Sequence, residues 1–162
     1  MFTVADIRNI AIQIEKNGEE AYLHACSEAK NDDVARILAR MAEEERAHAQ
    51  WFGRITSSRP LTDEEQKIES MGASLLTDMI EGNTFLLDGK ELAGMRTVAE
   101  VLGRARTFEE DTVVFYEFLL GLLDNAEAVE QLQRIIEEER NHIRQLAGIE
   151  DRSCRPPCLH RP

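Results

Sequence analysis

The sequence predicts an all-α fold, a four-helix bundle made of two duplicated helical hairpins joined by a long crossover that contains an extra helix. Three observations support this prediction. Only 9 Gly and 4 Pro occur in 162 residues, which favours long helices over a fold rich in turns. No segment alternates apolar and polar residues with the period of two that is typical of a strand. Finally, the first pair of expected helices is repeated by the last pair without a gap.

Five segments combine helical spacing of apolar residues with a signal for a helix start: 3–29, 32–56, 63–84, 91–123 and 125–147. Thr3 and Asp6 open the first at capping-box spacing. Asn31 precedes the second and is a favourable N-cap residue. The third follows Thr62 and is expected to be part of the crossover between the two hairpins.

The end of the last helix sets the expected domain boundary. Gly148 is typical of a residue that ends a helix, so we expect one domain over 1–148 and an irregular tail over 149–162. The tail carries Cys154 and Cys158. The chain has three Cys in all, and this odd number argues against a disulfide framework.

The charge balance excludes several classes of partner. The formal net charge is −12, which argues against binding to nucleic acid and against docking on anionic membranes. No apolar run approaches the roughly 20 residues of a membrane span. The first residues lack a basic region followed by an apolar stretch, so no signal peptide is evident. We therefore expect a cytoplasmic protein without a nucleic-acid or membrane partner.

The internal repeat relates residues 94 positions apart, because adding 94 to the number of Glu15 gives Glu109. The same shift relates several further pairs of identical residues: Tyr22 and Tyr116, Leu38 and Leu132, Arg40 and Arg134, Glu45 and Glu139, His48 and His142. The period is too long for a solenoid, so it indicates a duplicated helical hairpin.

Acidic and imidazole side chains interrupt the apolar faces of these helices at matching places. In the second helix, Glu45 and His48 lie in a stripe with spacings of three and four, which marks the face turned to the core. Glu139 and His142 do the same in the last helix, and the first and fourth helices carry one inner glutamate each. Glu15 and Glu45 both lie 15 residues from Lys30, or about 22 Å along the hairpin. The second hairpin has the same spacing, so all four glutamates are expected at one level.

Four buried carboxylates cannot all stay ionised without compensation, and two divalent cations would balance their charge. One glutamate from each of two helices, plus Glu-x-x-His from each of the other two, is a dimetal arrangement of helix bundles. Oxygen and imidazole donors suit iron, manganese or zinc. The expected metal ligands are Glu15, Glu45, His48, Glu109, Glu139 and His142.

Alternatives remain open for some of these residues. A polar network without metal is the alternative for the six-residue set. Glu44 is four residues from His48 and is not excluded by spacing, although Glu45 lies on the apolar stripe and is preferred. Tyr22 and Tyr116, the candidate catalytic residues, either pack in the core or donate a hydrogen bond to a ligand carboxylate.

The run Glu15-Lys16-Asn17-Gly18 with Tyr22, together with the two Glu-x-x-His pairs, resembles the rubrerythrin and bacterioferritin group of the ferritin-like superfamily over 3–148. The resemblance implies a non-haem di-iron site in a ferritin-like four-helix bundle. It implies that Glu45 and Glu139 bridge two iron ions, that Glu15 and His48 complete one of them, and that Glu109 and His142 complete the other.

Two features depart from the rubrerythrin pattern. Thr112 stands where rubrerythrins usually carry an additional glutamate. The rubredoxin domain with two Cys-x-x-Cys pairs is absent, so any reductant is expected to be a separate electron donor.

The expected function is that of a di-iron oxidoreductase, of peroxidase or ferroxidase type, that reacts Fe(II) with O2 or hydrogen peroxide. One alternative is an iron-handling or storage protein. Another is a structural helical module with a stabilising dimetal site. Mn or Zn fits the same ligands, and a homodimer or larger homo-oligomer is expected.

Overall fold

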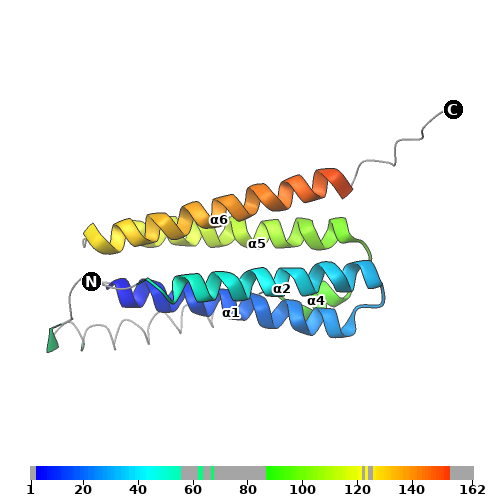
Figure 1. Cartoon of the computed structure of the whole chain (residues 1–162), viewed down its shortest axis with the longest axis horizontal. Coiled ribbons are helices and arrows are strands. Elements are labelled where there is room, and N and C mark those ends of the chain that lie inside the picture. Colours follow the sequence, from blue (N-terminus) through cyan, green and yellow to red (C-terminus); the bar gives the residue numbers. More distant parts are fainter. Residues whose placement is uncertain are drawn as a thin grey trace.

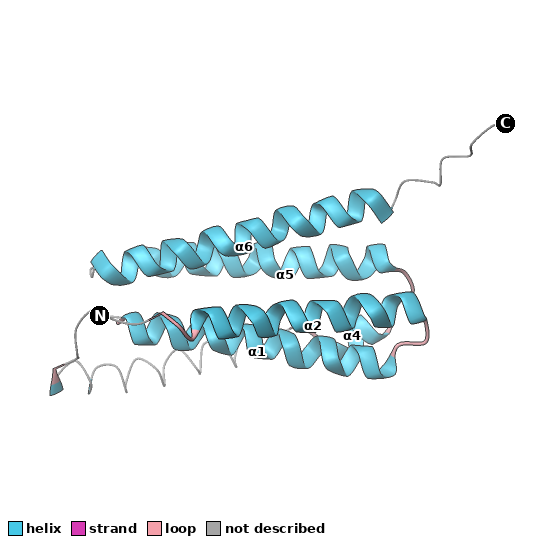
Figure 2. Ribbon diagram, viewed as in Figure 1, coloured by secondary structure: helices cyan, strands magenta, loops and turns pink. Residues whose placement is uncertain are grey.

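A computed structural model describes residues 3–55, 62, 63, 67, 87–121, 123 and 126–153, with side chains described up to 149. All regular structure in this part of the chain is helical (Figure 2). The described helices are α1 (Val4–Glu28), α2 (Asp32–Phe52), α4 (Gly89–Ala93), α5 (Val98–Leu120) and α6 (Ala126–Ser153). Helices α1 and α2 pack as one hairpin, and α5 and α6 pack as a second hairpin alongside it (Figure 1). The predicted all-α fold is confirmed.

The predicted starts of the first hairpin's helices are confirmed. The side chain of Thr3 accepts a hydrogen bond from the Asp6 amide at 3.2 Å, and the Asp6 carboxylate accepts one from the Thr3 amide at 2.8 Å. This reciprocal capping box satisfies two backbone donors at the start of α1. Asn31 caps α2 by accepting hydrogen bonds from the amides of Asp33 and Val34. Helix α2 ends at Phe52, four residues before the predicted end.

The predicted single helix over 91–123 is wrong, because the chain forms two helices there. Helix α4 ends at Ala93 with Gly94 as its C-cap, and α5 begins after Thr97. Thr97 and Glu100 form a second capping box, with the Glu100 amide 3.2 Å from the Thr97 hydroxyl and the Thr97 amide 3.1 Å from the Glu100 carboxylate. These bonds satisfy amides that an uninterrupted helix would bond to its own preceding turn.

The predicted helix end at Gly148 is also wrong, since α6 continues to Ser153. Glycine in a helix interior costs roughly 1 kcal/mol relative to alanine. Ile149, the next residue, packs against the core and offsets this cost. The first residues of the expected irregular tail are therefore helical, while Cys154 and Cys158 lie outside the described residues. The predicted helix over 63–84 also lies outside them, apart from Asp63 and Lys67.

The hydrophobic core draws on both hairpins and surrounds a polar layer at mid-bundle. Its largest fully buried apolar side chains include Ile7, Ile14, Leu38, Met41, Leu102, Leu119 and Leu132. Helices of both hairpins thus turn one apolar face inward, which fixes the inward direction of any polar residue on the same face. In the described segments, no helix is both long enough and apolar enough to cross a bilayer.

Candidate metal centre

Four glutamates, one from each long helix, are buried inside the bundle. Glu15 of α1, Glu45 of α2, Glu109 of α5 and Glu139 of α6 are each no more than 1% exposed. Each lies on the core-facing stripe of its helix, where burial of the neighbouring apolar residues leaves the carboxylate no route to solvent. The structure therefore brings together all four glutamates predicted from the sequence.

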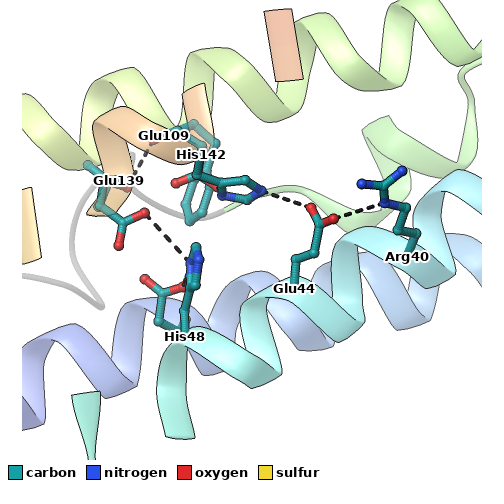
Figure 3. A network of polar contacts seen from close by, with 9 residues as sticks. Arg40, Glu44, His48, Glu109, Glu139 and His142 are labelled. Carbon is teal, nitrogen blue, oxygen red and sulfur yellow. Dashed lines mark hydrogen bonds and ion pairs between the residues drawn. The ribbon is translucent and has the colours of Figure 1, made fainter. Parts of the chain in front are cut away.

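The two predicted histidines turn the same ring nitrogen towards this cluster (Figure 3). Nδ1 of His142 lies 2.8 Å from Oε1 of Glu109. Nδ1 of His48 lies 3.4 Å from Oε2 of Glu15 and 3.8 Å from Oε2 of Glu139. The two imidazole rings meet edge to face, with their centroids 4.9 Å apart. Each histidine thus faces glutamates from helices other than its own.

The six side chains form overlapping groups of three, and within each group the potential ligand atoms lie within 4.8 Å of one another. The groups are Glu15 with Glu45 and His48, Glu45 with Glu109 and His142, and His48 with Glu139 and His142. Because the groups share members, they make one continuous cluster of nitrogen and oxygen donors. A cluster of this size and composition offers enough donors for two ions.

The carboxylates and imidazoles of the cluster contact one another as ion pairs, but these contacts are not hydrogen bonds of good geometry. Among the described residues, both carboxylate oxygens of all four glutamates and Nδ1 of both histidines are buried without a hydrogen bond of good geometry. Buried polar groups are normally hydrogen-bonded, and a buried charge is costly unless it is paired or binds a metal. Two divalent cations would balance four carboxylates and use these free lone pairs, and iron, manganese and zinc all accept such donors. The residues present therefore fit a dimetal centre.

The protonation behaviour of the cluster follows from burial and crowding. Burial, and then the neighbouring carboxylates, raise the pKa of Glu45 and of Glu139 well above the ordinary value. Burial alone would lower the pKa of His142, but contacts with Glu109 and Glu44 outweigh it and raise this pKa to about 10. Without a cation, the cluster therefore retains protons that a bound cation would displace.

The structure shows which of the neighbouring glutamates Glu44 and Glu45 lies in the buried cluster, a question that the spacing in the sequence left open. Glu45 is fully buried among the other glutamates, whereas the side chain of Glu44 is 25% exposed. Oε2 of Glu44 lies 2.9 Å from Nε2 of His142, on the side of the ring away from the cluster. No local pattern in the sequence predicts this contact, because it joins residues 98 positions apart.

The two tyrosines are fully buried close to the glutamates. In the described part of the chain, neither hydroxyl has a hydrogen-bond partner, so the predicted bond from Tyr22 or Tyr116 to a ligand carboxylate is not present. Thr112 is also buried, and its hydroxyl donates to the carbonyl of Phe108 at 2.9 Å. Thr112 is thus occupied by its own helix.

Comparison with known proteins finds a similarity in the first half of the chain. The rubrerythrin family model matches residues 6–85, which include α1 from Asp6 onward, α2 and the residues Glu15, Glu45 and His48. No match was found among curated proteins or among solved structures. Helices α5 and α6 repeat the matched ligand pattern at the same depth of the bundle. The first hairpin is therefore similar to the rubrerythrin family, and the second hairpin repeats its ligand pattern.

Proposed function

We propose that the protein is a non-haem di-iron oxidoreductase that reacts Fe(II) with O2 or hydrogen peroxide. The observation that carries this proposal is the buried set of carboxylate and imidazole donors that make no hydrogen bond of good geometry within the described part of the chain. Glu15 and His48 would hold one iron, and Glu109 and His142 would hold the other. Glu45 groups with both of these pairs and Glu139 groups with both histidines, so these two glutamates would be shared by both irons.

The chain's own residues would position the metal ions and exclude water. When bound, two ferrous ions would supply two electrons to O2 or hydrogen peroxide. The donors come from four packed helices, so their positions are set by the core rather than by loops. Phe52 is fully buried with its ring centroid 6.0 Å from that of His48, and it shields this side of the cluster. Glu45 and Glu139 can hold protons, because burial raises their pKa values.

The first test is metal loading under anaerobic conditions. Metal-free protein is titrated with Fe(II), bound iron is counted, and optical spectra are recorded after addition of O2 or hydrogen peroxide. We expect two iron ions per chain and new absorption when the oxidant is added. Metal analysis of the protein purified from its own host then identifies the natural metal.

Two double variants test which glutamates bind iron. Glu45→Ala with Glu139→Ala is expected to abolish iron binding. Glu43→Ala with Glu137→Ala is the matched control, because these glutamates are also related by the repeat but are 72% and 59% exposed. The control should bind iron as the wild type does. Unchanged iron content in the first double variant refutes the assignment.

Turnover measurements separate the proposed reaction from its rivals. With a separate electron donor, an oxidoreductase is reoxidised and reduced repeatedly. An iron-storage protein instead takes up many more than two irons per chain once it is assembled. A purely structural site gives no spectral change with peroxide, and chelation of its metal only lowers the melting temperature.

A further inference from the structure

Glu44 reaches from α2 to α6 and is held there from two sides (Figure 3). Oε2 lies 2.9 Å from Nε2 of His142. Oε1 accepts a hydrogen bond from Nε of Arg40, one turn earlier on α2, at 2.9 Å. Arg40 therefore fixes the carboxylate of Glu44 over the outer nitrogen of a histidine whose inner nitrogen faces Glu109.

This contact decides which nitrogen of His142 is available to a metal. A neutral imidazole carries one N–H and one free lone pair. An ionised carboxylate can only accept hydrogen bonds, so Glu44 holds the proton on Nε2. When a cation displaces the second proton of the imidazolium, the lone pair that becomes available is therefore on Nδ1, which lies 2.8 Å from Oε1 of Glu109 inside the cluster. A carboxylate in this position also makes the imidazole a stronger donor.

The other half of the centre lacks this support. By the repeat, Arg134 and Glu138 correspond to Arg40 and Glu44, and His48 corresponds to His142. Arg134 instead forms its ion pair with Glu130, one turn earlier on α6, at 2.7 Å. In the part of the chain that the structure describes, Nε2 of His48 makes no hydrogen bond, and its ion-pair contacts are made through Nδ1.

The sequence explains why the two arginines turn in opposite directions. The residue one turn before Arg134 is Glu130, an acceptor. The residue one turn before Arg40 is Arg36, which repels it and pairs with Asp33 instead. Arg40 therefore pairs forward with Glu44, while Arg134 pairs backward. This charge difference accounts for the different pairing of the two arginines, and of the two histidines in the cluster His142 has a carboxylate at its outer nitrogen.

We propose that Glu44 is a positioning residue for His142, and that it makes the metal position served by Glu109 and His142 bind more tightly than the position served by Glu15 and His48. This inference rests on the proposed dimetal function, and it adds the order in which the two positions take up metal ions. Removal of a carboxylate behind a metal-binding histidine typically costs roughly 10- to 100-fold in metal affinity.

The test is a calorimetric and optical titration of the full-length, metal-free protein with Co(II) under anaerobic conditions. The wild type is expected to bind two Co(II) ions in two unequal steps. Glu44→Gln keeps the shape of the side chain but removes its charge, and should weaken the tighter step by roughly 10- to 100-fold without changing the other. Glu138→Gln is the matched control, because it removes an equivalent charge beside Glu139, and should change neither step.

A second readout follows the proton itself. Nitrogen-detected NMR of the Zn(II)-loaded wild type should show a slowly exchanging Nε2–H on one histidine and not on the other. Glu44→Gln should lose this protection. Arg40→Gln leaves the carboxylate in place but removes its support, so it should weaken the same titration step by a smaller factor. If Glu44→Gln fails to fold, Arg40→Gln still tests whether the carboxylate of Glu44 strengthens metal binding by His142.

The outcomes separate this inference from the proposed function. Fewer than two Co(II) ions per wild-type chain would overturn the dimetal function, whatever Glu44 does. Two ions in equal steps would overturn the inference and leave the dimetal site standing. The inference also fails if Glu44→Gln weakens both steps equally, or if Glu138→Gln has the same effect as Glu44→Gln.

Discussion

Replacement of Glu139 by glutamine is expected to have opposite effects on the metal-free and the metal-loaded protein. Glu139 is fully buried, and burial together with neighbouring carboxylates raises its pKa well above 4.5. Glutamine has nearly the same shape and no charge. Glu139→Gln should therefore raise the free energy of unfolding of the metal-free protein, because it removes the cost of burying an ionisable carboxyl group. It should lower the free energy of unfolding of the metal-loaded protein, in which the carboxylate would bind metal.

The size of the gain follows from the cost of protonating the side chain. The unfolded chain releases the proton near pH 4.5, whereas the folded metal-free protein retains it to higher pH. Each pH unit between these limits costs the wild type about 1.4 kcal/mol of folding free energy. At pH 7 the cost is at most roughly 3 kcal/mol, and glutamine avoids it.

The direction of the raised pKa also determines how the contribution of Glu139 to the stability of the metal-free protein changes with pH. A raised folded pKa means that the contribution of Glu139 to stability is fully present below pH 4.5 and is lost as the pH rises towards the folded pKa. The advantage of Glu139→Gln in the metal-free protein should therefore be small near pH 5 and larger at pH 7.

Urea denaturation followed by circular dichroism measures these differences. The metal-free proteins are compared at pH 5 and pH 7 in the presence of a chelator, and the loaded proteins at pH 7 with Zn(II). Glu130→Gln is the control, because Glu130 lies on the same helix in an exposed ion pair, and should change stability by less than about 0.5 kcal/mol. A loss of stability in metal-free Glu139→Gln at pH 7, or an equal gain at both pH values, would refute the reasoning.

Three further substitutions test other parts of the site. Gly18→Ala places a Cβ 3.3 Å from three side-chain atoms of Glu45 and should therefore weaken Co(II) binding, while higher helix propensity should stabilise the metal-free fold by up to about 1 kcal/mol. An unaltered Co(II) titration would argue against the close fit. Tyr116→Phe removes a buried hydroxyl without a partner and should raise the urea midpoint of the metal-free protein, since such a group costs roughly 1–3 kcal/mol; a lower midpoint shows that the hydroxyl is bonded in solution. Glu130→Arg leaves Arg134 without its acceptor, so Arg134 should pair forward and the two Co(II) affinities should converge; a constant difference contradicts the account of the asymmetry.

Much of the fold was predictable because its signals are local. The capping box of Thr3 and the N-cap Asn31 lie next to the helices that they start, and both were predicted. The break before α5 was missed, although Thr97 and Glu100 carry the same signal, because apolar residues continue at helical spacing on both sides of it. The helix end predicted at Gly148 was wrong because a non-local contact outweighs the local signal. Ile149 packs against the core, and α6 continues past a residue type that usually ends a helix.

The buried cluster of glutamates and histidines was predictable, because a charged residue on a core-facing stripe must turn its side chain into the bundle. Glu45 and His48 interrupt an otherwise apolar face, and the repeat supplies an independent second example in Glu139 and His142. Glu44 was not predictable in the same way. It lies one residue off the stripe, at the edge of the helix, and only the packing of α2 near α6 decides what it meets.

The duplication explains both the symmetry of the donors and the asymmetry around them. The buried donors must meet at one point, so a change in either copy would leave partners without compensation. Residues outside this layer are not bound by that requirement. Arg36 and Glu130 occupy equivalent positions with opposite charge, and this difference accounts for the forward pairing of Arg40 and the backward pairing of Arg134. A bundle with matched ligands can therefore hold two metal ions in unequal environments, and each copy of the hairpin provides the control for variants of the other.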